Sequence, residues 1–187
     1  MTWPRRSLPS KPVLPISIAI IGAGPLGRSL ALRAARAGLR VFLEDVLPSN
    51  LHHAQEYIRQ ELNAEALTAV TFASTVEDAV RVADLVIDCM PDELESKLEI
   101  LWLLDRMAPP HSVFATPTTR LSIADLSSCT YRPAQCVAIA AEPFALAQST
   151  GPGVEIRTTA ATAPETIDLL NRFWCALGFS PQFRAEP

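Results

Sequence analysis

Short apolar runs alternate along the chain with segments whose apolar positions recur at helical spacing. The apolar runs predict buried strands at residues 16–21, 41–43, 70–72, 85–88, 113–115, 135–140, 154–156 and 180–183. Helical spacing predicts helices at residues 27–37, 51–63, 76–82, 91–108, 121–126 and 163–177. This alternation predicts an α/β fold, a single domain with a Rossmann-type doubly wound, mostly parallel sheet.

The two longest downstream helices carry additional signals. In the helix at 91–108, the apolar face that includes Leu94 and Met107 is expected to pack on the sheet. For the last helix, Thr162 and Glu165 have the spacing of a capping box, and Gly178 marks its end. Before the first strand, four prolines and no long apolar stretch predict an extended leader at 1–15, followed by the domain at 16–187.

A G-x-G-x-x-G sequence lies between the first strand and the first helix. Gly22 allows a tight turn, Gly24 allows close approach of a pyrophosphate, and Gly27 allows close packing of helix and strand. Pro25 and Leu26 complete the turn. Pro25 either weakens phosphate binding, because it lacks an N–H group, or simply favours the first helical turn. The sequence therefore predicts a dinucleotide site at residues 22–27.

An acidic pair, Glu44 and Asp45, follows the second strand. In dinucleotide folds an acid at this place binds the ribose 2′-hydroxyl, and its charge repels the 2′-phosphate of NADP. With no arginine nearby in sequence, NAD is the predicted cofactor, with Asp45 as its ribose ligand. The alternative is that this acidic pair forms only a solvated turn.

Composition and charge narrow the class of protein. A net charge of −4 without a basic stripe argues against nucleic acid as a partner. No apolar run reaches the length of a membrane span, so no membrane association is expected. The four cysteines have neither C-x-x-C spacing nor histidine partners, which predicts no metal site and buried free thiols, Cys175 among them, in a cytoplasmic protein.

The order of these motifs resembles the NAD-binding domain of the 3-hydroxyacyl-CoA dehydrogenases over about residues 16–183. The glycine turn and Asp45 match, and ADLVIDCMPDELESK at 83–97 resembles the family block aDLVIEavPE-x-LelK. Further on, TPTTRLSI at 116–123 resembles SNTSSLsI, and Arg132 with Pro133 resembles the family's RP pair. The resemblance implies the fold predicted above, NAD as cofactor and oxidoreductase chemistry.

The resemblance also assigns residues to the site. It places Asp92 and Lys97 among the cofactor contacts; alternatively Asp92 is a helix N-cap and Lys97 an ion-pair partner of Glu93. Glu155 matches the carboxylate that orients the catalytic histidine, and Thr119 supplies a hydroxyl for the substrate. Counting from Arg132 puts Ala140 at the position of that histidine.

Two departures shape the functional expectation. With Ala140 the general base is missing, and His52, His53 and His111 are expected at the surface, away from the reacting centre. The family also continues into a helical domain that completes the acyl-CoA site and forms the dimer, whereas this sequence ends at Pro187. A homodimer or a partner chain is therefore expected to complete the site for an acyl-CoA-type or other small substrate.

Three functional hypotheses remain open. The first is an NAD(H)-binding oxidoreductase that resembles 3-hydroxyacyl-CoA dehydrogenase and is weak or inactive alone. The second is a non-catalytic NAD-binding subunit or interaction module. The third is a reductase for another small carbonyl compound or imine, in which Arg120 binds an anionic substrate.

Overall fold

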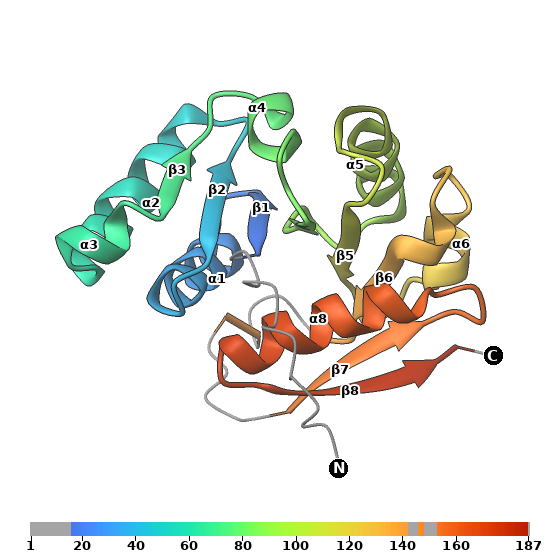
Figure 1. Cartoon of the computed structure of the whole chain (residues 1–187). Helices are drawn as coiled ribbons and strands as arrows, with labels where there is room; N and C mark the ends of the chain where they lie inside the picture. The colour runs from blue at the N-terminus through green and yellow to red at the C-terminus, as the bar shows by residue number, and fades with distance from the viewer. Residues whose placement is uncertain (1–15, 142–145, 148–152, 187) are drawn as a thin grey trace, which may run out of the picture.

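A computed structural model of the chain describes residues 16–141, 146–147 and 153–186, and the expected leader lies outside this part. Its strands form one eight-stranded sheet in the order β3-β2-β1-β4-β5-β6-β7-β8 (Figure 1). The strands are β1 (Ser17–Ile21), β2 (Arg40–Glu44), β3 (Val70–Phe72), β4 (Leu85–Asp88), β5 (Val113–Pro117), β6 (Cys136–Ile139), β7 (Gly153–Thr158) and β8 (Ser180–Ala185). All neighbours are parallel except β6 and β7. The predicted Rossmann-type, mostly parallel sheet is confirmed.

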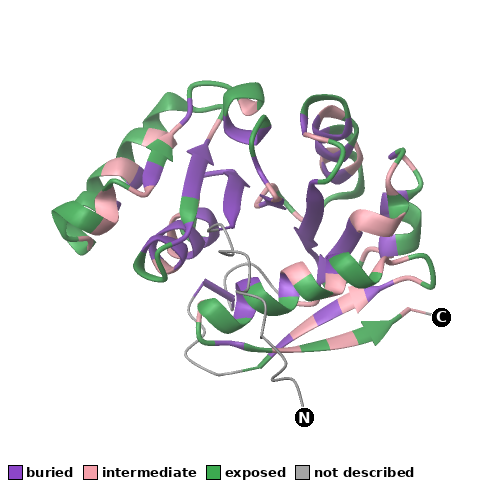
Figure 2. Cartoon of the chain, viewed as in Figure 1, coloured by how far each residue is buried: buried purple, intermediate pink, exposed green. Residues whose placement is uncertain are grey.

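Helices cover both faces of this sheet (Figure 1). They are α1 (Pro25–Arg36), α2 (Pro48–Glu61), α3 (Ala64–Leu67), α4 (Val76–Val80), α5 (Leu94–Met107), α6 (Ile123–Ser127) and α8 (Pro164–Ala176). One buried cluster joins the sheet to α1 and α8, and a second joins it to α4, α5 and α6. The central strands are buried throughout, while the edge strand β8 is largely exposed (Figure 2). No helix of the described ranges is long and apolar enough to cross a membrane.

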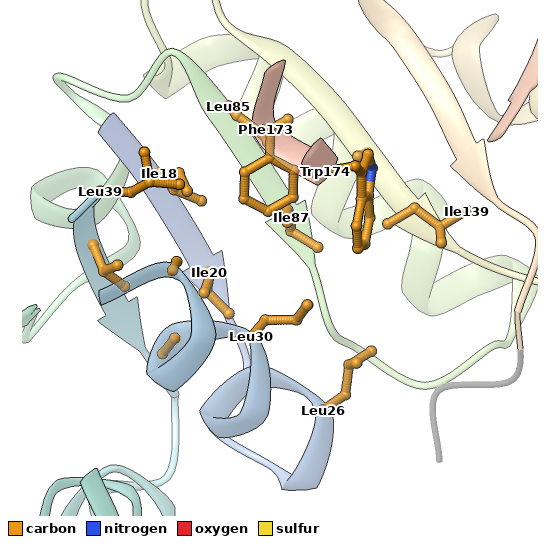
Figure 3. Packing of buried hydrophobic residues seen from close by; sticks show 14 of the residues in the cluster. Ile18, Ile20, Leu26, Leu30, Leu39, Leu85, Ile87, Ile139, Phe173 and Trp174 are labelled. Carbon is orange, nitrogen blue, oxygen red and sulfur yellow. The ribbon is translucent and has the colours of Figure 1, made fainter. Parts of the chain in front are cut away.

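The α1/α8 face shows why the hydrophobic pattern specifies this arrangement. Alternate residues of β1, Ile18 and Ile20, point to the same face, as expected from the two-residue period of a strand (Figure 3). They meet Leu30 of α1 and Trp174 of α8 in one buried cluster. Trp174 is fully buried, and its ring packs edge-on against Phe179 with 5.4 Å between the centroids. Burial of each large apolar side chain contributes roughly 1.5–3 kcal/mol to stability.

The structure corrects three local expectations. The N-cap of α8 is Ala163, without a side-chain bond, because the hydroxyl of Thr162 instead accepts a hydrogen bond from Thr159 N–H at 2.9 Å. Leu94 and Met107 of α5 are exposed, since the buried side of this helix is formed by neighbouring positions such as Leu101. Cys175 is exposed on α8, although all four cysteines are free thiols.

Candidate cofactor and substrate site

The glycine turn joins β1 to α1 with the geometry that its sequence predicts. Gly22 has φ +104°, and its N–H donates to the carbonyl oxygen of Glu44 at 2.8 Å. A Cβ atom on Gly27 would lie 1.8 Å from the carbonyl oxygen of Gly22, so α1 can pack this closely only on a glycine. A Cβ atom on Gly24 would meet nothing within 4 Å, which leaves open space in front of the turn.

The N-terminus of α1 faces this open space, and no side chain of the described residues caps its first backbone N–H groups. Its N-cap, Gly24, offers no side-chain acceptor, and the first turn contains no acidic residue. Such an uncapped helix start attracts an anion through its free N–H groups and the helix dipole. Pro25 occupies the first turn, and Leu26 after it is buried against the core. The first-turn interpretation of Pro25 thus holds, and its effect on phosphate affinity stays a prediction.

Asp45 fastens the end of β2 to the glycine turn. Its Oδ2 accepts a hydrogen bond from Ala23 N–H at 2.7 Å, and its Oδ1 accepts one from Leu47 N–H at 2.8 Å. Asn50 donates to the same carboxylate at 3.3 Å. The neighbouring Glu44 is buried, and burial, with a smaller contribution from the charge of Asp45, raises the pKa of its carboxyl.

A cavity of about 500 Å³ lies at the carboxyl ends of β1, β2 and β4. It brings together the predicted residues Gly22, Gly24 and Asp45, and Ile100 and Leu103 of α5 close its apolar side. This is the switch point of the sheet, where open α/β folds bind their ligands. The sequence analysis missed the two α5 residues, because helical periodicity alone does not distinguish a side chain that packs on the sheet from one that lines a cavity.

The side chain of Lys97 pairs with Asp88 and not with Glu93. Its side chain is fully buried, and its Nζ lies 2.9 Å from Asp88 Oδ2 and donates to Met90 O at 3.0 Å. The hydroxyl of Thr116, at the end of β5, donates to the same Asp88 oxygen at 2.8 Å. The prediction that Lys97 forms an ion pair is therefore correct, but the predicted partner, Glu93, is wrong. This buried network fixes the ends of β4 and β5, while contact of Lys97 with a cofactor stays a prediction.

Asp92 connects the loop after β4 to the loop after β5. Its Oδ2 accepts a hydrogen bond from Thr119 N–H at 3.3 Å, and its backbone carbonyl accepts one from Arg120 at 3.1 Å. The N-cap of α5 is Glu93, so the N-cap alternative for Asp92 is wrong. Within the described part of the chain, Asp92 Oδ1 is buried and has no hydrogen-bond partner. A donor from a bound molecule would satisfy it.

Ala140 and Glu155 are neighbours where β6 meets β7. Ala140 N–H donates to the carbonyl oxygen of Glu155 at 2.9 Å, and both residues are half-buried. The structure therefore brings together the two positions that the resemblance pairs, although they are 15 residues apart in the sequence. The Glu155 side chain lines a second cavity, of about 440 Å³, which also contains Arg120, the neighbour of the exposed Thr119.

The histidines lie away from both cavities. His52 and His53 are exposed on α2, and His111 is exposed before β5, with its Nε2 3.5 Å from Asp84 Oδ1. Their expected surface positions are confirmed. Among the described residues, no group of three or more His, Cys, Asp or Glu side chains is arranged to hold a metal ion.

The residues of the first cavity fit a dinucleotide. Open space at Gly24 and the uncapped start of α1 fit a pyrophosphate, and the carboxylate of Asp45 stands at the strand end where a ribose hydroxyl would bind. The buried, unpartnered oxygen of Asp92 offers a further acceptor nearer the second cavity. These observations come from three different strand ends and agree on one ligand.

Comparison with known proteins gives the same picture. The family model "3-hydroxyacyl-CoA dehydrogenase, NAD binding domain" matches residues 17–181. A probable 3-hydroxybutyryl-CoA dehydrogenase of Bacillus subtilis is 29% identical over 133 residues, covering 64% of this chain and 46% of that protein. The lambda-crystallin homolog of Bos taurus is 30% identical over 181 residues, covering 89% of this chain and 56% of that protein. The chain thus spans about half the length of these relatives.

Solved structures share the fold. The 3-hydroxyacyl-CoA dehydrogenase of Archaeoglobus fulgidus superposes with a TM-score of 0.76 at 24% identity, covering 92% of this chain and 57% of that one. The (S)-3-hydroxybutyryl-CoA dehydrogenase of Ralstonia eutropha gives a TM-score of 0.80 at 20% identity, covering 91% of this chain and 64% of that one. At these identities the likeness extends to the arrangement of strands and helices alone.

Proposed function

This chain belongs to the family of the 3-hydroxyacyl-CoA dehydrogenase NAD-binding domain, whose cofactor is NAD, and we propose that it is an NAD(H)-binding oxidoreductase domain with weak activity alone. The cavity that joins the glycine turn to Asp45 is the observation that carries the proposal. The first turn of α1 holds the pyrophosphate, Asp45 holds a ribose, and Asp92 supports the portion of the cofactor near the substrate.

The chemistry that we propose is oxidation of a hydroxyl-bearing carbon or the reverse reduction. Bound NAD⁺ supplies the hydride acceptor. Glu155 and Thr119 lie near the substrate, the hydroxyl of Thr119 donates a hydrogen bond to the oxygen that becomes the carbonyl, and the substrate proton passes to an acid/base group supplied by another chain. Ala140 occupies the position that the family resemblance gives to the catalytic histidine. A positioned acid or base contributes about 10²–10⁴ in rate, so its loss explains a weak enzyme.

The first test measures cofactor binding with a change that leaves the protein fold intact. Gly24 has φ −64°, and an added Cβ meets no protein atom within 4 Å, so Gly24→Ala blocks only the approach of a ligand. We expect calorimetric titration to show that the natural chain binds NADH in preference to NADPH. In Gly24→Ala, NADH affinity should fall by roughly tenfold or more, which corresponds to about 1.4 kcal/mol of binding free energy.

Gly153→Ala is the matched control, because a Cβ atom there also meets nothing within 4 Å and Gly153 lines neither cavity. It should leave NADH affinity unchanged. Failure of the natural chain to bind NADH, or equal binding by Gly24→Ala, would contradict the proposed site.

A second test restores the missing base. In Ala140→His the imidazole would stand beside Glu155, as the hydrogen bond from Ala140 N–H to Glu155 O predicts. We expect the rate of reduction of a 3-oxo substrate by NADH, either acetoacetyl-CoA or acetoacetate, to rise by about 10²–10⁴, followed as loss of NADH absorbance. Ala141→His, one residue further along, is the control and should give no gain.

The outcome also decides between the first two hypotheses. If Ala140→His binds NADH normally and gains no activity, the assignment of position 140 is wrong. The non-catalytic NAD-binding module would then be the better description of this chain.

A further inference from the structure

The second cavity is lined by three arginines that the cofactor site does not use. Val154 and Ile156 of β7 pack in the cluster that contains α8, so the alternate residues Glu155 and Arg157 point to the opposite face of the sheet. Arg184 of β8 lies directly beside Arg157 in the parallel register. Together with Arg120, these side chains line one cavity of about 440 Å³ next to α6.

One of the three arginines is neutralised within the protein. Arg157 forms an ion pair with Glu186, with 2.9 Å between Nη1 and Oε1. The other oxygen of Glu186 accepts hydrogen bonds from Ser122 Oγ at 3.2 Å and from Ile123 N–H at 2.9 Å. Glu186 is therefore shared between Arg157 and the start of α6.

Arg120 and Arg184 keep uncompensated positive charge. The structure gives Arg120 only the neutral carbonyl of Asp92, at 3.1 Å, and gives the exposed Arg184 no partner among the described residues. Like charges directly opposite each other on neighbouring strands destabilise a sheet, and Arg184 lies opposite Arg157. Glu155 is the one remaining acid among the described residues of the lining, and together these residues carry a net positive charge of about one.

The positively charged second cavity lies close to the cofactor cavity. Thr119 and Arg120 both contact Asp92, and the preceding residues Met90 and Pro91 line the cofactor cavity. The two cavities therefore adjoin through the loop after β4. A molecule held by Arg120 and Arg184 lies beside Glu155, which we propose lies near the substrate.

We propose that this cavity binds the carboxylate of a small hydroxy or oxo acid and so selects the substrate class of the oxidoreductase; this inference rests on the proposed function. Arginine recognises planar carboxylates with paired N–H donors, and a cavity of this size suits a small molecule. Phosphate shares that chemistry.

The test titrates the full chain, saturated with NADH, with 3-hydroxybutyrate, which cannot react with the reduced cofactor. Methyl 3-hydroxybutanoate has the same carbon skeleton without the charge, and inorganic phosphate is the competing anion. We expect the free acid to bind at least tenfold more tightly than either the ester or phosphate. Arg184→Gln and Arg120→Gln should each weaken binding of the acid by roughly tenfold or more while NADH affinity stays unchanged.

Arg59→Gln is the control, because Arg59 is exposed on α2 and lines neither cavity. It should bind the acid as the natural chain does. Equal affinity for acid and ester, tighter binding of phosphate, or no effect of both Arg120 and Arg184 substitutions would overturn the inference. Failure to bind NADH is a separate result, which would overturn the proposed function. The affinities for the acid, the ester and phosphate would then test the anion site by themselves.

Discussion

Lys97 is the residue whose environment differs most from what its sequence position suggests. A lysine one turn after a glutamate on a helix normally lies in solvent, yet this side chain is fully buried and bonded to Asp88. Two buried charges are tolerated only when each satisfies the other. The Lys97–Asp88 ion pair, together with the hydrogen bond from Thr116 to Asp88, thus holds the loop that carries Asp92 in place, and Lys97 acts by positioning other residues.

Substitution of Lys97 tests whether its ion pair with Asp88 stabilises the fold. Lys97→Met leaves the carboxylate of Asp88 buried without its cation, and we expect the free energy of unfolding in urea to fall by about 3–5 kcal/mol. The double variant Lys97→Met with Asp88→Asn should recover part of this loss, because it removes the stranded charge. Glu93→Gln, which tests the other possible partner, should change stability by no more than about 0.5 kcal/mol. A larger effect of Glu93→Gln than of Lys97→Met would contradict the observed pairing.

At the scale of single residues, the sequence was informative where the chemistry is local. Gly22, Gly24, Gly27 and Asp45 lie within one strand-turn-helix-strand segment, so a short motif sufficed to bring them together. Thr116 and Asp88 are 28 positions apart, and no spacing in the sequence indicates that they meet. Arg157 and Arg184, which line the second cavity with Arg120, were missed for the same reason.

Among the helices and strands, periodicity predicted the order and type of the elements well, because most strands are buried on both faces. The strand at Leu85–Asp88 and the strand at Val70–Phe72 agree with the expected ranges. Features that depend on neighbouring elements were not predictable. The hydrophobic pattern of β7 does not indicate that it runs antiparallel to β6, and the exposed face of α5 follows from which positions α4 and α6 cover.

The start of α8 illustrates the limit of local motifs. Thr162 and Glu165 have capping-box spacing, but the hydroxyl of Thr162 bonds to Thr159 in the preceding turn. Ala163 is left as the N-cap, and its N–H donates to the carbonyl of Ala134 instead. The Thr162 hydroxyl is thus used by the preceding turn, and the helix start is held by a tertiary contact with Ala134, which only the folded chain reveals.

At the scale of the whole molecule, the cofactor site and the distant α8 belong to one cooperative unit. The same buried cluster contains Val41 of β2, Ile18 of β1 and Trp174 of α8, so it extends from the cofactor side of the sheet to the helix that covers β7. Continuous packing of this kind predicts that these elements unfold together rather than one after another.

Cofactor binding should therefore stabilise parts of the chain that it does not touch. NADH at a hundred times its dissociation constant adds about 2.7 kcal/mol to the free energy of unfolding if only the native state binds it. We expect hydrogen exchange to slow by about a hundredfold in the most protected amides of both β1 and α8, because exchange in both requires global unfolding. Gly24→Ala at the same NADH concentration should show a smaller gain in both elements. Protection that rises in β1 alone would mean that α8 opens independently, and the single cooperative unit would have to be abandoned.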